Sequence, residues 1–199
     1  VEKIKVTKEI AKIILNNGQK YNPLSLSVID SIKKEIKILS EENDIKVIII
    51  SSNGPGFSAG HDLEELKKNR NNKKFFLKLF SKCSELMQKI ITIQQPVIAE
   101  VPGMAAAAGC QLVATCDLAI ASEKATFMTP GVNIGLFCST PMVAVSRNIG
   151  RKKLMEMLLT GESLGATDAV NYGLINKCVK HELLEKTTLD MASLIASKP

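Results

Sequence analysis

Two short stretches of small residues are places where the main chain itself could do chemistry. One is FSAGHDL, residues 57–63, and the other is GMAAAAGCQ, residues 103–111. Each follows a strand-like run and precedes a helix-like run, so each is expected to leave unpaired backbone N–H groups at a helix start. Two such turns that converge can aim two donors at one oxygen. This is how an oxyanion hole stabilises charge on a carbonyl, at ~3 kcal/mol for one donor.

Small residues at a helix start have a second explanation, because they also let a helix pack closely against a strand. Either loop alone fits that explanation. The presence of both loops in one repeating pattern of strands and helices favours a functional site.

The elements that must position these loops alternate along the chain. Branched residues on both sides of Lys8 and Glu9 predict a hairpin near the N-terminus, and helical spacing from Leu24 predicts a helix. The apolar run at 45–52 predicts a buried central strand. Later segments follow the same pattern: a helix from about Phe76 to Ile90, strands at 96–101, 116–122 and 173–179, two short helices within 139–160, and a final helix.

Local signals predict how the middle of the chain is organised. Asp62, three residues before Glu65, indicates a capping pair in front of a short helix, and residues 69–74 are expected to form a polar loop. The alternation predicts an α/β fold with mostly parallel strands and crossover helices. The length of 199 residues fits one domain spanning 1–199.

Composition limits the classes of partner. The net charge of +6 comes almost wholly from scattered lysines, and there is no tryptophan, so nucleic-acid binding is not expected. A basic surface still suits an anionic small molecule.

Five cysteines without a CxxC pair, and two separated histidines, indicate a protein with reduced cysteines and without a metal site. No apolar run reaches the ~18 residues of a membrane span. The chain starts at Val1, so no targeting signal can be read from it.

Several motifs carry a resemblance to a known family. GPGFSAGHDLEEL at 54–66, the segment PVIAEVPGMAAAAGCQ and its continuation to residue 137, and LLTGESLGATDAVNYGLINKCV at 158–179 resemble the enoyl-CoA hydratase/isomerase, or crotonase, superfamily. The resemblance implies a ββα spiral core, a homotrimer or dimer of trimers, and an acyl-CoA thioester as ligand. Coenzyme A is then part of the substrate and no separate cofactor is expected. It also implies a mitochondrial location, or otherwise a cytoplasmic one. Family members usually continue with further helices, which are expected to be missing here.

The resemblance assigns roles to individual residues. The oxyanion donors are expected to be the backbone N–H groups of Ala59 and Ala108, the latter standing where glycine is common. Tyr21 could alternatively cover the core. The residues expected to hold the coenzyme A moiety lie in two loops: Lys20, Tyr21 and Asn22, and Ala59, Gly60, His61 and Asp62.

Hydratases of this family use two glutamates, and this sequence has Gln111 and Gly131 at the corresponding positions. An amide can orient water but cannot exchange a proton near neutral pH, and glycine has no side chain. Positioned acid and base groups are typically worth ~10²–10⁴ in rate, so efficient hydration is not expected.

Three other residues are candidates for chemistry. His61 lies in a loop that resembles that of methylmalonyl-CoA decarboxylase, and the alternative is a helix-start histidine without a partner. Glu100 is a carboxylate within an apolar strand, either buried near the pocket or at an exposed edge. Cys138 could approach the acyl end or could simply pack. Asp62 is expected to be a helix cap.

Three functions remain open from the sequence. The first is an acyl-CoA enzyme that stabilises a thioester enolate for isomerisation or decarboxylation. The second is a catalytically silent acyl-CoA-binding or regulatory protein. The third, ordinary hydration, needs an acid or base that the sequence does not supply.

Overall fold

A computed structural model describes all residues of the chain, 1–199. The N-terminal hairpin is confirmed: β1 (Glu2–Lys5) pairs antiparallel with β2 (Ile10–Leu15). The central strand is confirmed as β3 (Val47–Ser52), in which every residue is buried. Such a continuous apolar run is typical of a strand covered on both faces.

The larger of two sheets has six strands. Its spatial order is β1-β2-β3-β5-β7-β10, and every pairing beyond the hairpin is parallel. The expected strands at 96–101 and 116–122 form its centre, whereas the strand expected at 173–179 is shorter. The bounds of these strands are β5 (Val97–Val101), β7 (Leu118–Ser122) and β10 (Lys177–Val179).

A second sheet of four short strands is not predicted by the sequence pattern. Its order is β4-β6-β8-β9, parallel except for the last pair. These strands have two or three residues each and many small side chains, so they carry no alternating pattern that could predict them. Their bounds are β4 (Gly56–Ser58), β6 (Met104–Ala106), β8 (Thr126–Met128) and β9 (Leu164–Gly165).

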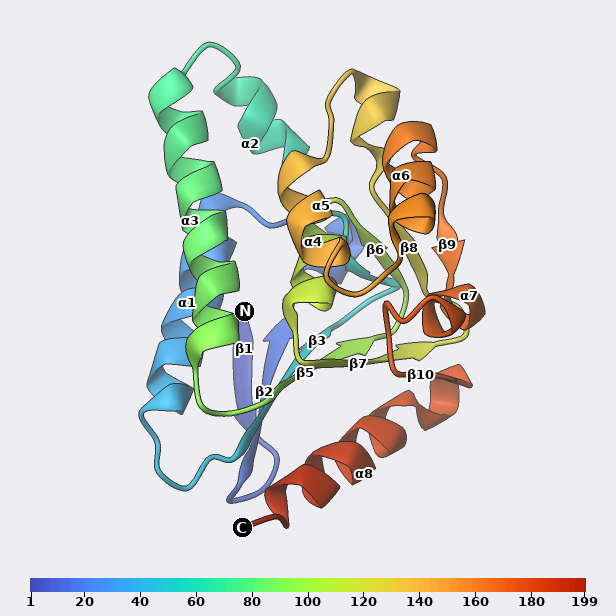
Figure 1. Cartoon of the computed structure of the whole chain (residues 1–199). Coiled ribbons are helices and arrows are strands. Elements are labelled where there is room, and N and C mark those ends of the chain that lie inside the picture. The colour runs from blue at the N-terminus through green and yellow to red at the C-terminus, as the bar shows by residue number, and fades with distance from the viewer.

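Helices cover both faces of the six-stranded sheet (Figure 1). The two helices α1 (Leu26–Ser40) and α3 (Lys73–Thr92) pack side by side and run in the same direction at the left of the view. Helix α8 (Leu184–Ala196) crosses the opposite face, where Ala192 and Ala196 pack against branched residues of β2, β3 and β5. The main core of 43 buried residues lies on the side of α1 and α3.

Shorter helices complete the fold around the second sheet. They are α2 (Leu63–Lys68), α4 (Ala108–Thr115), α5 (Ser139–Val145), α6 (Arg151–Thr160) and α7 (Ala166–Asn171). The two helices expected within 139–160 are confirmed as α5 and α6. The sequence pattern does not predict α7, because its six residues span too few turns to show a clear apolar period.

Two local expectations need correction. Asp62 does cap α2, because its carboxylate accepts hydrogen bonds from the N–H groups of Glu64 and Glu65. Glu65 does not return the bond, since its carboxylate accepts the N–H of Leu26 at 3.0 Å and ties α2 to α1. The polar loop expected at 69–74 ends earlier, because Asn72 caps α3 through a bond from the N–H of Phe75.

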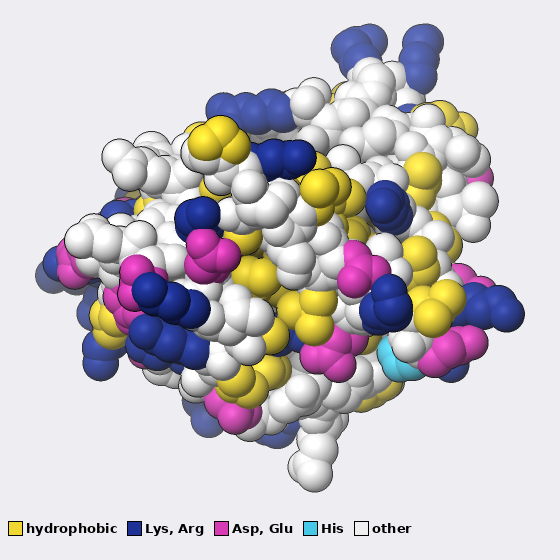
Figure 2. Space-filling view, turned by 90° about the horizontal axis from the view of Figure 1, so that it is seen from below, with side chains coloured by type: hydrophobic (Ala, Val, Ile, Leu, Met, Phe, Trp, Pro, Cys, Tyr) yellow, Lys and Arg dark blue, Asp and Glu magenta, His cyan; other side chains and the backbone are white.

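The surface carries charges of both signs. In Figure 2, Lys and Arg side chains are spread over the visible face among Asp and Glu rather than gathered into one patch. None of the helices combines the length and the apolar character that crossing a lipid bilayer requires.

Candidate active site

The two loops singled out in the sequence meet in the second sheet. Strand β4 ends in the first loop and β6 in the second, and the two strands are parallel neighbours. Gly60 has a φ of 89°, and a Cβ placed on it would lie 2.9 Å from the Ala106 carbonyl oxygen and 3.1 Å from the Ala108 nitrogen. The loops can therefore approach only because residue 60 has no side chain.

The second loop turns sharply into α4. Ala107 has a φ of 48° and donates its N–H to the Met128 carbonyl oxygen at 3.0 Å, which pins the turn to β8. Ala108 is the first residue of α4, and its N–H has no acceptor within the chain. The helix start therefore presents one free main-chain donor next to Gly60.

The first loop differs from the expectation for Ala59. The Ala59 N–H donates to the Tyr21 carbonyl oxygen at 2.8 Å, and the Gly60 N–H to Ser58 Oγ at 3.2 Å. The next N–H along the loop, that of His61, has no acceptor within the chain. The Ala59 amide is thus already used, which speaks against its donating to a substrate. The unpaired amide is that of His61.

The imidazole of His61 is held beside this amide. Its Nδ1 lies 3.3 Å from the Leu24 carbonyl oxygen, and the ring packs edge-to-face against Phe80 with centroids 5.5 Å apart. Nε2 is buried without a partner. Burial lowers the pKa of His61, although the hydrogen bond with Leu24 and the charge of Glu65 act in the opposite direction. The neutral ring is therefore the favoured form.

A cavity of about 230 Å³ opens where these groups meet. Its walls are mainly apolar, which makes hydrogen bonds inside it stronger than in water. No aspartate or glutamate lines it. Its lining comes from α2, α3, the start of α4, and the segment before α5: Ala59, His61, Leu63, Leu66, Phe80, Ala107, Ala108, Gly131, Ile134, Leu136, Phe137, Cys138, Ser139, Thr140 and Pro141.

Gln111 and Gly131, the two positions that the resemblance matches to glutamates, have different surroundings. Gln111 is 6% exposed, and its side-chain amide makes no hydrogen bond within the chain. It faces an adjoining cavity rather than the one just described. At Gly131 the room for a side chain is taken, because a Cβ would lie 2.6 Å from the Leu136 carbonyl oxygen and 2.9 Å from Cys138 Sγ.

The loop at 20–22 is built mainly to hold its own shape. Asn22 is buried, has a φ of 50°, and its side-chain amide donates to the carbonyl oxygens of Asn53 and Gly56. Tyr21 is 45% exposed, and its ring lies next to Gly56. The Lys20 ammonium lies 3.4 Å from the carboxylate of Glu64 on α2.

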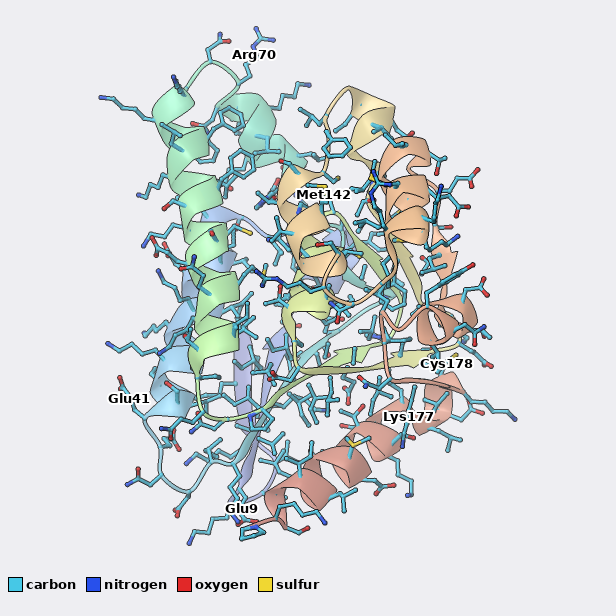
Figure 3. The ribbon with its side chains drawn as sticks, viewed as in Figure 1. Glu9, Glu41, Arg70, Met142, Lys177 and Cys178 are labelled. Atoms are coloured by element: carbon cyan, nitrogen blue, oxygen red, sulfur yellow. The ribbon has the colours of Figure 1, made fainter.

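Basic side chains lie on α2 and after it, beside the cavity. Lys67, Lys68 and Arg70, together with Glu64, line a shallow hollow on the surface. Arg70 projects into solvent at the top of Figure 3, in the loop between α2 and α3. Leu63 and Leu66 of the same helix line the cavity, so this short helix contributes to the apolar wall and also carries basic side chains nearby.

Glu100 lies away from the site, and both sequence-based alternatives for it are wrong. It is buried in the central strand β5, where its carboxylate lies 3.1 Å from Lys12 Nζ and accepts a hydrogen bond from Ser51 Oγ at 2.7 Å. Lys12 also contacts Glu185 of α8 at 3.0 Å. The carboxylate therefore belongs to an ion pair beneath α8.

Cys138 does lie in the cavity wall, as the sequence suggested, but as a buried thiol. Burial raises its pKa, which keeps the sulfur protonated and poorly nucleophilic. Burial likewise raises the pKa of Cys83 to about 11 and of Cys110 to about 12. No group of three His, Cys, Asp or Glu side chains is placed to ligate a metal ion.

The apolar walls of the cavity were not identified from the sequence. Leu63, Phe80, Ile134 and Phe137 remain 43% to 65% exposed, so they are not core residues. The one signal available was their position, since Leu63, Ile134 and Phe137 lie within the recognised motifs. Their exposure could be found only from the tertiary structure.

Comparison with known proteins identifies the family. The sequence pattern of the Enoyl-CoA hydratase/isomerase family matches residues 5–199. The chain therefore belongs to the enoyl-CoA hydratase/isomerase family, and its mostly parallel sheets have the crotonase α/β fold.

Particular relatives are similar over nearly the whole chain. It is 49% identical to the Homo sapiens protein called enoyl-CoA hydratase domain-containing protein 3, mitochondrial, over 94% of this chain and 62% of that protein. It is 34% identical to the probable mitochondrial enoyl-CoA hydratase of Dictyostelium discoideum, over 94% of this chain and 67% of that protein. The chain thus spans about 62% of the length of the mammalian relatives that it matches.

Solved structures agree in fold. The crystal structure of human enoyl coenzyme A hydratase domain-containing protein 3 superposes with a TM-score of 0.93 at 47% identity, covering 97% of this chain and 76% of that one. The enoyl-CoA hydratase of Mycobacterium smegmatis gives a TM-score of 0.96 at 40% identity, covering 100% of this chain and 77% of that one.

Proposed function

We propose that this protein binds an acyl-CoA thioester and stabilises its enolate through two main-chain donors, the N–H groups of His61 and Ala108. The observation that carries the proposal is that two unpaired amides come from turns in contact with each other and border one cavity. A thioester oxygen that accepts both bonds would gain most when it becomes negatively charged.

The surroundings support an anionic, carrier-bound substrate. The apolar cavity keeps water from competing for the two donors. The basic side chains Lys67, Lys68 and Arg70 lie at its outer edge, where they would attract the phosphates of coenzyme A. Lys20 and the loop before Asn22 lie next to α2 and are proposed to contact the same moiety.

Efficient hydration is not part of the proposal. Addition of water needs a group that gives or takes a proton at the neighbouring carbons. Gln111 and Gly131 cannot do so, and no carboxylate borders the cavity. His61 is the remaining acid–base candidate there, and its neutral ring could accept a proton. Isomerisation or decarboxylation, in which an enolate is the main difficulty, suits this set of groups better.

A catalytically silent acyl-CoA-binding protein is the second candidate. It is favoured by Gly131, because the Leu136 carbonyl and Cys138 thiol fill the place from which a side chain would reach the substrate. Restoring glutamate there would require the 131–138 segment to move.

Assembly and location are also proposals. We infer a homotrimer or a dimer of trimers from the family, and a mitochondrial location from the printed names of the relatives. The exposed apolar residues Ile134 and Leu136 near the cavity are compatible with contacts between subunits.

Calorimetric titration with acetyl-CoA, paired with turnover assays on crotonyl-CoA and methylmalonyl-CoA, tests the function. We expect binding, weak hydration of crotonyl-CoA, and at least tenfold weaker binding by Gly60→Ala, because a Cβ there would push the two donor loops apart. Gly165→Ala is the matched control, since a Cβ at that position meets no atom within 4 Å.

The outcomes separate the candidates. Binding without turnover of any acyl-CoA supports the silent protein. An absence of binding by the folded wild type would overturn both candidates. Equal binding by Gly60→Ala, with an unchanged circular dichroism spectrum, would contradict the role of the two loops.

A further inference from the structure

The imidazole of His61 is anchored at one ring nitrogen only. Nδ1 lies 3.3 Å from the Leu24 carbonyl oxygen, and the N–H of Leu24 donates to the Gly60 carbonyl oxygen at 2.7 Å, so the anchor and the loop are tied together. A carbonyl oxygen can only accept a hydrogen bond, so the neutral ring carries its proton on Nδ1. Nε2 is then left with a lone pair that can accept a proton.

Nothing in the chain uses that lone pair. Nε2 is buried and makes no hydrogen bond, which is costly and uncommon for a buried polar atom. His61 and Phe80, against whose ring it packs, both line the cavity of about 230 Å³, whereas Leu24 does not. The anchored edge of the imidazole therefore lies away from the cavity, and Nε2 is the ring nitrogen that a ligand in the cavity can engage.

No other group around this cavity is suited to take a proton from carbon. Its lining includes one further titratable side chain, Cys138, and burial raises the pKa of that thiol, so the sulfur keeps its own proton. Ser139 and Thr140 contribute hydroxyl groups, which are poor bases without an activating partner. The other lining residues have apolar side chains or none.

We propose that His61 is a catalytic residue that removes a proton from the substrate carbon next to the thioester, and that Nε2 is the atom that receives it. The inference rests on the proposed acyl-CoA function and adds the group that forms the enolate. The C–H bond breaks, its electron pair becomes the C=C bond of the enolate, and the carbonyl π electrons move to the oxygen held by the two main-chain N–H groups. Return of the proton two carbons further along a 3-enoyl group would complete an isomerisation without water.

One residue is able to serve both ends of this step. The oxygen and the α-carbon of a thioester are two bonds apart, so a ligand bound to the His61 N–H carries its α-carbon close to the imidazole of the same residue. The protonated ring keeps its hydrogen bond to Leu24 and gains attraction from the carboxylate of Glu65, which the N–H of Leu26 holds at 3.0 Å. Phe80 of α3 and Ala108 of α4 add no charge at the ring. Glu65 is therefore a positioning residue that acts through His61.

The tautomer can be observed directly, because the chain has only two histidines, His61 and His181. In ¹⁵N-edited NMR spectra above pH 6.5, His61 should show a protonated Nδ1 and an unprotonated Nε2, with His181→Gln giving the assignment. A neutral ring protonated on Nε2 would overturn the proposal.

Proton removal is measured as exchange of the acetyl-CoA methyl protons with D₂O, followed by mass spectrometry. His61→Gln keeps the main-chain N–H, so it should slow the exchange by about a hundredfold or more while acetyl-CoA binds within about threefold of the wild type. His181→Gln is the matched control and should exchange at the wild-type rate. The wild-type rate should fall as the pH drops below 6.5, and Glu65→Gln should move the midpoint to lower pH, because the charge that raises the pKa of His61 is removed.

The outcomes separate this inference from the proposed function. Exchange by folded His61→Gln at the wild-type rate would overturn the role of the imidazole and leave the enolate function in place. Binding of acetyl-CoA without exchange by the wild type would overturn the base and support the silent protein. If acetyl-CoA does not bind at all, the proposed function fails as well.

Discussion

His61 is the residue at which the site's main-chain and side-chain chemistry meet. Its N–H is unpaired, its Nε2 is buried without a partner, and its ring packs edge-to-face against Phe80. The two unsatisfied groups belong to one residue, so a ligand in the cavity could satisfy both. A buried imidazole of this kind also affects stability, because its protonation becomes coupled to unfolding.

We predict that His61 makes the protein less stable in acid. Burial places its folded-state pKa below the ordinary value of 6.5, so below that value the unfolded chain binds a proton that the folded chain does not. This contribution is present above pH 6.5 and is lost as the pH falls towards the folded-state pKa. His61→Gln should therefore lose less stability than the wild type between about pH 7.5 and about pH 5 in urea unfolding.

His181→Gln is the matched control, since it removes the other histidine and leaves the contribution of His61 in place. Identical pH profiles for the wild type and His61→Gln would show that this ring titrates alike in both states.

At the scale of elements, the parallel strands, α8 and the buried ion pair depend on one another. Lys12 of β2 and Glu100 of β5 lie on the face of the sheet that α8 covers, and Glu185 of α8 completes the cluster. The pair lies across β3, whose Ser51 supplies a further hydrogen bond. Three strands and a helix are thus joined by a few polar groups in an otherwise apolar layer.

We predict that Glu100→Ala lowers the free energy of unfolding by about 3 kcal/mol, because it leaves the Lys12 ammonium buried with one exposed partner. Lys12→Met alone should cost a similar amount. The double variant Lys12→Met with Glu100→Ala should cost clearly less than the sum, since no buried charge remains. Urea unfolding of all four proteins gives the coupling, and strict additivity would contradict it.

At the scale of the whole molecule, the site exists only in the native state. Its two unpaired amides belong to residues 61 and 108, and the cavity walls extend from Ala59 to Pro141 and belong to several elements. An unfolded chain has no comparable arrangement of free amides around an apolar cavity. Binding should therefore stabilise the folded state by mass action.

We predict that acetyl-CoA at ~100 times its Kd raises the free energy of unfolding by ~2.7 kcal/mol. For a protein of this size that corresponds to an increase in Tm of roughly 5–10 °C, measured by thermal unfolding. Free coenzyme A at the same concentration lacks the carbonyl that the two amides are proposed to bind, so its shift should be smaller. Equal shifts would indicate that the amides do not contact the thioester.

Much of the fold was accessible from the sequence because its signals are local. The buried run in β3, the apolar spacing in α1 and α3, and the cap at Asp62 each depend on neighbouring residues. The motifs also indicated the family correctly. The four short strands of the second sheet carry no such period, and pairing with distant segments stabilises them.

The sequence by itself determined the family and the main strands and helices. The tertiary structure decided which groups are free to act. The sequence gives no reason to prefer the N–H of Ala59 or that of His61 as a donor. In the folded chain the Ala59 N–H donates to the carbonyl oxygen of Tyr21, in a distant loop, whereas the His61 N–H has no acceptor. Glu100 is a candidate by its residue type, but in the folded chain Lys12 lies beside it and pairs with its carboxylate. Hydrogen bonds between remote segments consume most polar groups, and only the folded chain reveals those that remain.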